Sequence, residues 1–318
     1  MSKKVLFISN PAKYASYYMR AETIANRLRS EGYETEIFLW HGVRDAISLL
    51  RAIFRADAVI SVKFFGRGMA PLLALSRRKM IYDCVDNFDF DGFAYRHGRR
   101  FISDYVVNNG LHRDFIAREV ALPGQPVTVI EHHHSNFARQ LRHAGTSKVI
   151  GYIGNRHDYG VGDGFSVWCE QRGLHLYVNH STSLSNAEAI SENLKLDVYF
   201  MLLPTAASSE KEAKRLGYVR DFKPAQKILL PFSLGIPTIC APYHAYFEAV
   251  RAAGYDVGDF LFVETEDELR SAIDRITDPA NAAWLAELIE RQKIVAENYH
   301  LDTIIEKYKK LIASADEG

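Results

Sequence analysis

Short apolar runs alternate with segments of helical spacing along the first half of the chain. The run at 4–8 ends at Asn10 and Pro11 and predicts a buried strand. The apolar positions at Ile24, Ala25 and Leu28 then predict a helix over 18–30. Further strands are expected at 34–40, 58–62 and 79–83, helices at 49–54 and 71–76, and two more elements at 101–108 and 127–130. Strands that alternate with helices in this way favour a parallel sheet covered on both faces.

The alternation restarts after a predicted linker at 140–147. Strands are expected at 148–153, 173–178, 197–203, 238–241 and 260–263, and helices at 186–194, 225–234, 266–276 and 281–297. The pattern therefore predicts two successive α/β halves. The first half lacks a G-x-G-x-x-G sequence, so a dinucleotide site is not indicated there.

The composition is that of a soluble globular protein. The 318 residues are enough for two domains, with 47% hydrophobic and 25% charged residues. The three cysteines, Cys84, Cys169 and Cys240, lie far apart without a C-x-x-C pair, which indicates reduced, buried thiols. No apolar run is long enough to span a bilayer. We expect a cytoplasmic protein that touches membranes only from outside, if at all.

The net charge of zero hides an uneven distribution. Residues 1–146 contain 21 Lys and Arg against 14 Asp and Glu, and the remainder contains 18 against 25. Basic clusters at 77–79 and at Arg96, Arg99 and Arg100 could meet anionic lipid head groups, although solvated faces explain single clusters equally well. A peripheral contact between the basic first domain and an anionic membrane is therefore one expectation. No nucleic-acid-binding motif is present, so that partner class is not indicated.

Three basic residues, Arg220, Lys223 and Lys227, precede the apolar helix predicted at 225–234. Lys223 and Lys227 are four residues apart, so on a helix they would share one face and could clamp a diphosphate. Helix N-termini also favour anions through their free N–H groups and the helix dipole. A solvated basic turn before an ordinary amphipathic helix would give the same spacing, and both interpretations stay open.

The segment KPAQKILLPFSLGIPTI resembles the donor-domain signature of GT-B glycosyltransferases. In that signature a lysine eight residues before the glycine of a small-x-G-x-P-T/V-I turn contacts the nucleotide-sugar phosphates. The matching positions here are Lys227, Gly235, Pro237 and Ile239. The paired glutamates of family 4 are replaced by Phe222 and Leu230, and Glu248 is the nearest candidate for their donor contacts. We include Tyr243 with Glu248 among the expected donor-binding residues.

The strand predicted at 148–153 opens into Gly154, Asn155 and Arg156, small and polar residues at a point where a phosphate can approach backbone N–H groups. Gly160, Gly162 and Gly164 are expected to keep this loop open. Many GT-B donor domains begin with a strand that ends in Gly-x-Arg, so the resemblance implies a phosphate contact for Arg156. In those domains the arginine pairs with a lysine a few residues further on. No lysine follows Arg156 nearby, so Lys227, Lys223 or Arg220 would take the place of that lysine. A flexible glycine loop with a surface arginine is the alternative.

Two carboxylates, Asp83 and Asp86, end the strand predicted at 79–83. Inverting transfer needs a base that takes the proton of the acceptor hydroxyl. Asp86 is the preferred base, and His41, at another strand end, is the second choice. Capping of a strand end explains Asp83 and Asp86 equally well, because aspartate is favoured in turns.

The run 132–134 consists of three histidines. In an extended segment only His132 and His134 share a face, and no second Cys or His cluster has ligand spacing, so a metal site is not expected. By resemblance this run matches the end of the first GT-B domain, so a histidine there, His133 in our assignment, could contact substrate or act as base. A hydrogen-bonded structural histidine is the alternative.

The resemblance implies an α/β fold with two Rossmann-like domains facing a cleft, and a C-terminal helix crossing back to the first domain. The expected ranges are 1–143 for the acceptor domain, 147–297 for the nucleotide-sugar domain and 298–318 for the returning helix. The implied activity moves a sugar from a nucleotide-sugar donor to a glycan or lipid-linked acceptor in cell-surface polysaccharide assembly, without metal or further cofactor. A nucleotide-sugar epimerase of the same fold and a non-catalytic partner of another transferase are the alternatives.

Overall fold

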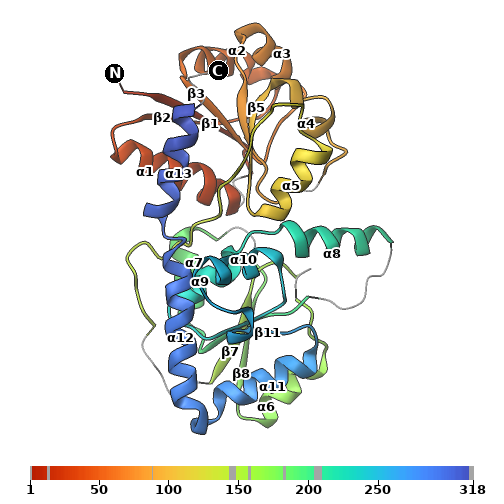
Figure 1. The fold of residues 1–318 in the computed structure, drawn as a ribbon, viewed down its shortest axis with the longest axis vertical. Coiled ribbons are helices and arrows are strands. Elements are labelled where there is room, and N and C mark those ends of the chain that lie inside the picture. The colour runs from red at the N-terminus through yellow and green to blue at the C-terminus, as the bar shows by residue number, and fades with distance from the viewer. Residues whose placement is uncertain are drawn as a thin grey trace. The chain divides into compact units, whose positions relative to one another are not determined.

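The computed structural model describes residues 2–12, 15–87, 89–142, 148–156, 159–181, 184–203 and 210–314. The chain forms two compact units, each built on its own parallel sheet (Figure 1). Unit 1 comprises Met1–His132, Phe222–Pro224 and Asp302–Gly318, and unit 2 comprises His133–Asp221 and Ala225–Leu301. The predicted domain ranges stay predictions.

Unit 1 contains a six-stranded sheet in the order β2-β1-β3-β4-β5-β6, and every pair of neighbours is parallel. Its strands are β1 Lys4–Ser9, β2 Glu34–Leu39, β3 Ala58–Val62, β4 Met80–Asp83, β5 Ile102–Val107 and β6 Val127–Val129. All residues of β3 and β4 are buried, as expected for central strands of a parallel sheet with both faces covered. The strands predicted for the first half are confirmed.

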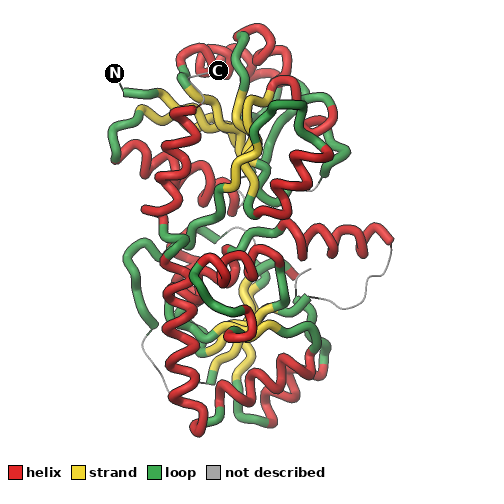
Figure 2. The backbone as a smooth tube through the Cα atoms, in the orientation of Figure 1, coloured by secondary structure: helices red, strands yellow, loops and turns green. Residues whose placement is uncertain are grey.

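Most helices of unit 1 connect successive strands of this sheet, and α13 is the last element of the chain (Figure 2). They are η1 Tyr17–Glu22, α1 Thr23–Ser30, η2 Val43–Asp45, α2 Ala46–Arg55, α3 Met69–Ser76, α4 Phe93–Arg96, η3 Arg99–Phe101, α5 Gly110–Glu119 and α13 Leu301–Ser314. From Asp302 onward, the last helix α13 belongs to unit 1, so the predicted return of the C-terminal helix to the first domain is confirmed.

Unit 2 contains a five-stranded parallel sheet in the order β11-β10-β9-β7-β8. Its strands are β7 Val149–Ile153, β8 His175–Asn179, β9 Val198–Met201, β10 Thr238–Cys240 and β11 Leu261–Phe262. The second strand of unit 2, β8, lies on one side of β7, and the third, β9, lies on the other. The strand order therefore reverses beside β7, which makes the carboxyl ends of β7 and β9 the usual place for a ligand in such a sheet.

The helices of unit 2 are α6 Gly164–Gln171, α7 Asn186–Asn193, α8 Glu210–Phe222, α9 Gln226–Ser233, α10 His244–Ala252, η5 Val257–Asp259, α11 Glu266–Thr277, η6 Pro279–Asn281 and α12 Ala282–Glu297. The assignment of Gly164 to an open loop is wrong, because this glycine begins α6. Within the described ranges no helix is long and apolar enough to cross a bilayer. Cys84, Cys169 and Cys240 are buried and none is in a disulfide, in line with the sequence.

Candidate nucleotide site in unit 2

A glycine, a tyrosine and a lysine from distant parts of the chain meet at the carboxyl end of β7. The Nζ of Lys227 donates a hydrogen bond of 3.0 Å to the hydroxyl of Tyr152, 75 residues earlier in the chain. The same ammonium group lies 5.2 Å from the centroid of the Tyr152 ring. The Tyr152 hydroxyl in turn donates to the backbone oxygen of Asn155 at 2.7 Å. Two predicted donor-binding segments, 154–156 and the start of α9, are thus brought together.

The backbone at position 154 favours glycine. Its φ of 147° lies in the region that other residues rarely adopt. A Cβ on Gly154 would lie 2.8 Å from the Nζ of Lys227 and 2.9 Å from the Tyr152 hydroxyl. The lysine head therefore lies directly against the backbone where β7 ends.

The start of α9 adds positive potential to this place. Lys227 is the second residue of α9, and the N-cap residue Ala225 makes no side-chain hydrogen bond to the helix start. The free N–H groups and the dipole of a helix start favour anions, as does a lysine ammonium. The arrangement can therefore bind a phosphate or carboxylate.

Aromatic rings that the sequence did not indicate surround Tyr152. The Tyr159 ring lies 5.4 Å and the His180 ring 6.2 Å from that of Tyr152, and Tyr159 and His180 meet edge to face at 5.5 Å. His180 directly follows β8 and is exposed. Burial raises the pKa of Tyr159 to about 12, so its phenol stays neutral. The rings have no sequence signature, because they gather only through the sheet order.

The loop after β7 packs on the end of β9. A Cβ on Gly160 would lie 2.3 Å from the carbonyl carbon of Leu203, so this close approach requires glycine. The backbone N–H of Gly162 donates to a Glu266 carboxylate oxygen at 2.7 Å. Gly160 and Gly162 thus anchor the described part of this loop beside the end of β9 and the start of α11.

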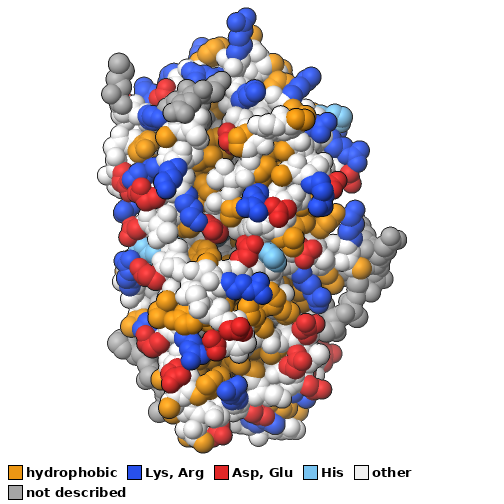
Figure 3. Space-filling view, viewed as in Figure 1, with side chains coloured by type: hydrophobic (Ala, Val, Ile, Leu, Met, Phe, Trp, Pro, Cys, Tyr) orange, Lys and Arg blue, Asp and Glu red, His pale blue; other side chains and the backbone are white. Residues whose placement is uncertain are grey.

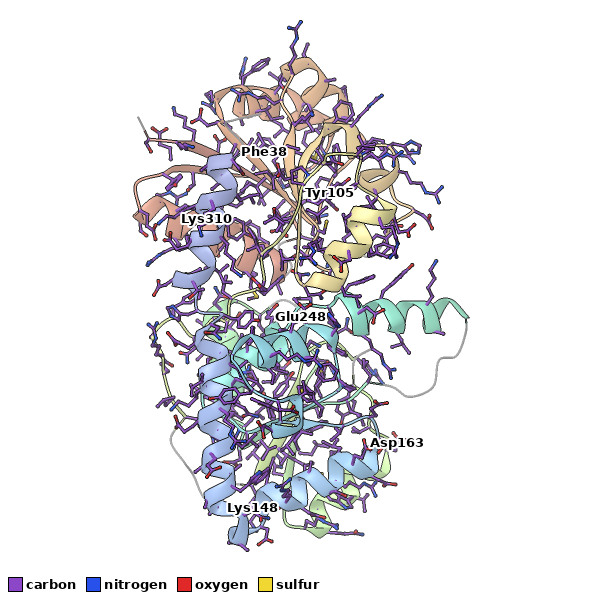
Figure 4. The ribbon with its side chains drawn as sticks, viewed as in Figure 1. Phe38, Tyr105, Lys148, Asp163, Glu248 and Lys310 are labelled. Atoms are coloured by element: carbon purple, nitrogen blue, oxygen red, sulfur yellow. The ribbon has the colours of Figure 1, made fainter. Side chains whose placement is uncertain are left out.

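The remaining predicted donor-binding residues of unit 2 occupy different surroundings. Asn155 and Arg156 are exposed in the loop after Gly154. Glu248, labelled on α10 in Figure 4, has a carboxylate oxygen 2.8 Å from Nε2 of the His244 ring and can accept a hydrogen bond from it. Tyr243 is fully buried, and its ring lies 4.7 Å from that of Tyr246. Tyr243 therefore contributes to the core beneath α10.

The prediction that Lys223 and Lys227 share one face of a helix is wrong. The helix α8 ends at Phe222 and α9 begins at Gln226, so Lys223 lies in the break between them. Lys223 also belongs to unit 1, whereas Lys227 belongs to unit 2. Pro224 explains the break, because proline disfavours helical backbone in the residue before it.

The candidate bases lie in three separate surroundings. Asp86 forms an ion pair with Lys63, with Oδ1 at 2.5 Å from Nζ. His41 is largely exposed, and its ring Nδ1 lies 3.3 Å from an Asp45 carboxylate oxygen. His133 is fully buried, with its Nδ1 2.9 Å from the backbone oxygen of His134. These placements leave the catalytic assignment a prediction.

Asp83, the other carboxylate at the end of β4, is part of a buried network in unit 1. Its two carboxylate oxygens accept hydrogen bonds from the Arg20 guanidinium at 2.8 and 3.0 Å. The Tyr308 hydroxyl on α13 donates to Asp83 at 2.9 Å, and Arg20 also donates to the backbone oxygen of Glu131 at 2.8 Å. Asp83, Arg20 and Tyr308 are all fully buried, so this carboxylate holds the returning helix in place.

The three histidines of the run 132–134 are buried. Burial lowers the pKa of His134 to about 3, which keeps its imidazole neutral. The ring of His134 meets that of His300 edge to face at 5.5 Å. Among the residues that the structure describes, no group of three or more His, Cys, Asp or Glu side chains could hold a metal ion.

Neither a family model nor a curated protein matches the sequence. The structure does resemble solved glycosyltransferases. An alpha-glucosyltransferase in complex with UDP and a 13-mer DNA containing an HMU base aligns with a TM-score of 0.65 and 9% identity, over 99% of this chain and 100% of its own. An O-GlcNAc transferase mutant from Thermobaculum terrenum gives 0.52 and 13%, over 99% and 68%. TarM gives 0.53 and 13%, over 84% and 57%.

At identities this low, the structural similarity demonstrates a shared fold only. The substrates of those enzymes cannot be transferred to this chain on that basis. Within each unit, the parallel sheet and the connecting helices agree with the expectation from the KPAQKILLPFSLGIPTI segment. The chain therefore has the α/β fold of the GT-B glycosyltransferases, with two Rossmann-like domains.

Proposed function

We propose that this protein is a glycosyltransferase that takes a sugar from a nucleotide-sugar donor bound in unit 2. The observation that carries the proposal is the ammonium group of Lys227 held against Gly154 and Tyr152 at the end of β7. A diphosphate is the anion that such a site in a parallel α/β sheet commonly takes. The fold shared with enzymes solved with UDP and UDP-glucose makes UDP the first nucleotide to test.

The proposed chemistry is displacement at the anomeric carbon of the donor sugar. An acceptor hydroxyl oxygen forms the new bond to that carbon while the bond to the leaving diphosphate breaks. Lys227 and the start of α9 stabilise the negative charge that develops on the diphosphate, a purely electrostatic role. The hydroxyl proton goes to a base in an inverting reaction, and Asp86 stays our preferred base, ahead of His41 and His133.

Side-chain cations supply the positive charge in this scheme, so we propose transfer without metal or another cofactor. The proposed acceptor is a glycan or a lipid-linked glycan of the cell surface, used by a cytoplasmic enzyme that contacts an anionic membrane. The basic composition of residues 1–146 supports an anionic acceptor or membrane.

Titration calorimetry with UDP, GDP, dTDP, CDP, CMP and ADP, with and without Mg²⁺, tests the donor site. One nucleotide should bind without metal, and Lys227→Ala should weaken it about 10- to 100-fold, the usual loss for a hydrogen bond to a charged group. Lys293→Ala is the matched control, because Lys293 is on α12 and pairs with Glu290 at 2.9 Å. If no nucleotide binds, or if both variants bind like the wild type, the donor site is refuted.

Incubation of the matching nucleotide sugar alone separates the activities. Conversion into an isomeric sugar without acceptor would replace our proposal by an epimerase. Transfer should instead require added acceptor, and both glycan and HMU-containing DNA acceptors belong in the assay, because a structural neighbour was solved with such DNA. Nucleotide binding without any turnover would favour a non-catalytic partner of another transferase.

A further inference from the structure

Large apolar side chains are exposed on two neighbouring helices of unit 1. Val43 is 78%, Ile47 66% and Phe54 53% exposed on η2 and α2, and Leu75 on α3 is 65% exposed. The helices α2 and α3 pack against each other, as Figure 1 shows. We call these four residues, with the exposed cations described below, the α2–α3 surface. Exposed apolar side chains mark interaction sites where they gather on one surface.

The helix α2 has two distinct faces. Leu49, Ala52 and Ile53 are buried in the core. Ile47, Arg51 and Phe54 are spaced i, i+4 and i+7, so they lie on one outward face. The outward apolar residues are therefore organised along the helix and mixed with a positive charge.

The cations of the α2–α3 surface are available for a partner. Arg44, Arg51, Arg77, Arg78 and Lys79 are exposed. None of the five has an ion pair with another residue that the structure describes. Residues 43–79 contain eight Lys and Arg but only two acidic residues, Asp45 and Asp57. Figure 3 shows Lys and Arg side chains among hydrophobic ones at this end of unit 1.

The other basic cluster of unit 1 is engaged within the unit. Arg96 forms an ion pair with Asp91. Arg99 donates to the backbone oxygen of Val120 at 3.4 Å, and the Arg100 guanidinium lies 4.8 Å from the centroid of the Phe101 ring. Of the two clusters noted in the sequence, the one at 77–79 therefore offers the more accessible charge.

We propose that the α2–α3 surface docks on the head-group region of an anionic lipid bilayer. Exposed Ile, Leu and Phe side chains can enter the interface while arginines and lysines contact lipid phosphates, as in amphipathic elements that lie on membranes. Nucleic acid would match the cations, but it would leave the aliphatic side chains in water. This docking refines the membrane contact suggested above and does not depend on sugar transfer, so its test is separate from nucleotide binding.

Flotation of the full chain with phosphatidylcholine vesicles, with and without phosphatidylglycerol, tests the proposal. The wild type should bind only the anionic vesicles, and less at high salt. Arg51→Glu with Arg78→Glu should weaken binding at least about thirtyfold, since each Lys or Arg near an anionic surface contributes about fivefold. The control is Arg251→Glu with Lys310→Glu, two exposed residues on α10 and α13 with the same change in charge. It should weaken binding by less than about threefold.

A second pair of variants tests the apolar part. Ile47→Ser with Phe54→Ser should also weaken flotation, while the circular dichroism spectrum of the folded chain stays unchanged. The proposal is overturned if the wild type does not float with anionic vesicles, or if both charge-reversed pairs lose binding equally. Retention on duplex DNA without flotation would overturn it in favour of a nucleic-acid surface.

Discussion

The loss of the Asp83 carboxylate should destabilise unit 1 more than most single changes. This carboxylate has no exposed surface and accepts three hydrogen bonds, two from Arg20 and one from Tyr308. In Asp83→Ala the guanidinium would stay buried without its counter-charge. Breaking a buried ion pair on one side costs about 3–5 kcal/mol, because the remaining charge is uncompensated.

The expected size of the effect is large enough to measure by calorimetry. In a domain of the size of unit 1, each kcal/mol of lost stability lowers the melting temperature by about 2–4 °C. Asp83→Ala should therefore lower the unfolding midpoint of unit 1 by about 6–20 °C. Tyr308→Phe removes only one hydrogen bond to the carboxylate and should cost about 1.5–3 kcal/mol.

A double replacement separates the burial of a lone charge from the loss of packing. In Arg20→Met with Asp83→Leu both charges are replaced by apolar groups of similar size, so this variant should be more stable than Asp83→Ala. Scanning calorimetry of the four proteins at pH 7 gives the comparison. A midpoint of Asp83→Ala within about a degree of the wild type, or a double variant less stable than Asp83→Ala, would refute this reasoning.

Three further predictions concern the site, the pH dependence and the packing of unit 1. Gly154→Ala should weaken nucleotide binding at least about tenfold in calorimetry, because its Cβ would lie 2.8 Å from the Lys227 ammonium, whereas Gly162→Ala, with its nearest contact at 3.5 Å, should not. Burial lowers the pKa of His112 to about 3, so the unfolded state binds more protons between pH 3 and 6.5. The unfolding free energy is therefore largest above pH 6.5 and falls by up to about 1.4 kcal/mol per pH unit below it, and urea titrations at pH 7 and 5 should show a smaller loss in His112→Phe. Phe222→Ala should cost about 3–5 kcal/mol in the same titrations, because this 4% exposed ring stacks on His112 at 5.0 Å, and a cost below about 1 kcal/mol would contradict the packing.

Several helices were not predicted, for identifiable reasons. The helix α8 is rich in charge, and its apolar residues crowd into its second half, so no continuous stripe indicates it. The helix α5 starts at a glycine, which hides it from a propensity argument. Its signal was the preceding Asn109, whose side chain accepts a hydrogen bond from the backbone N–H of His112.

The role of Asp83 shows where local reasoning stops. In the sequence, Asp83 and Asp86 both follow one strand, and capping of the strand end explains both equally well. In the structure, Asp83 is buried against Arg20 and against Tyr308, which is 225 residues further along the chain. Asp86 instead forms an ion pair with Lys63. No local pattern contains the return of α13, so none could distinguish the two.

Hydrophobic period and turn residues are local properties, so the sequence alone predicts the strands and the two α/β halves. The spacing from Lys227 to Gly235 and the strand end at Gly154 likewise mark these residues as candidates for the site. The break that leaves Lys223 outside α9, and the gathering of the Tyr159 and His180 rings beside Tyr152, arise only in the folded chain. These contacts between distant residues depend on the order of the strands in the sheet, which places the ends of β7, β8 and β9 side by side. That order follows from long-range packing of whole elements, which no short window of the chain contains.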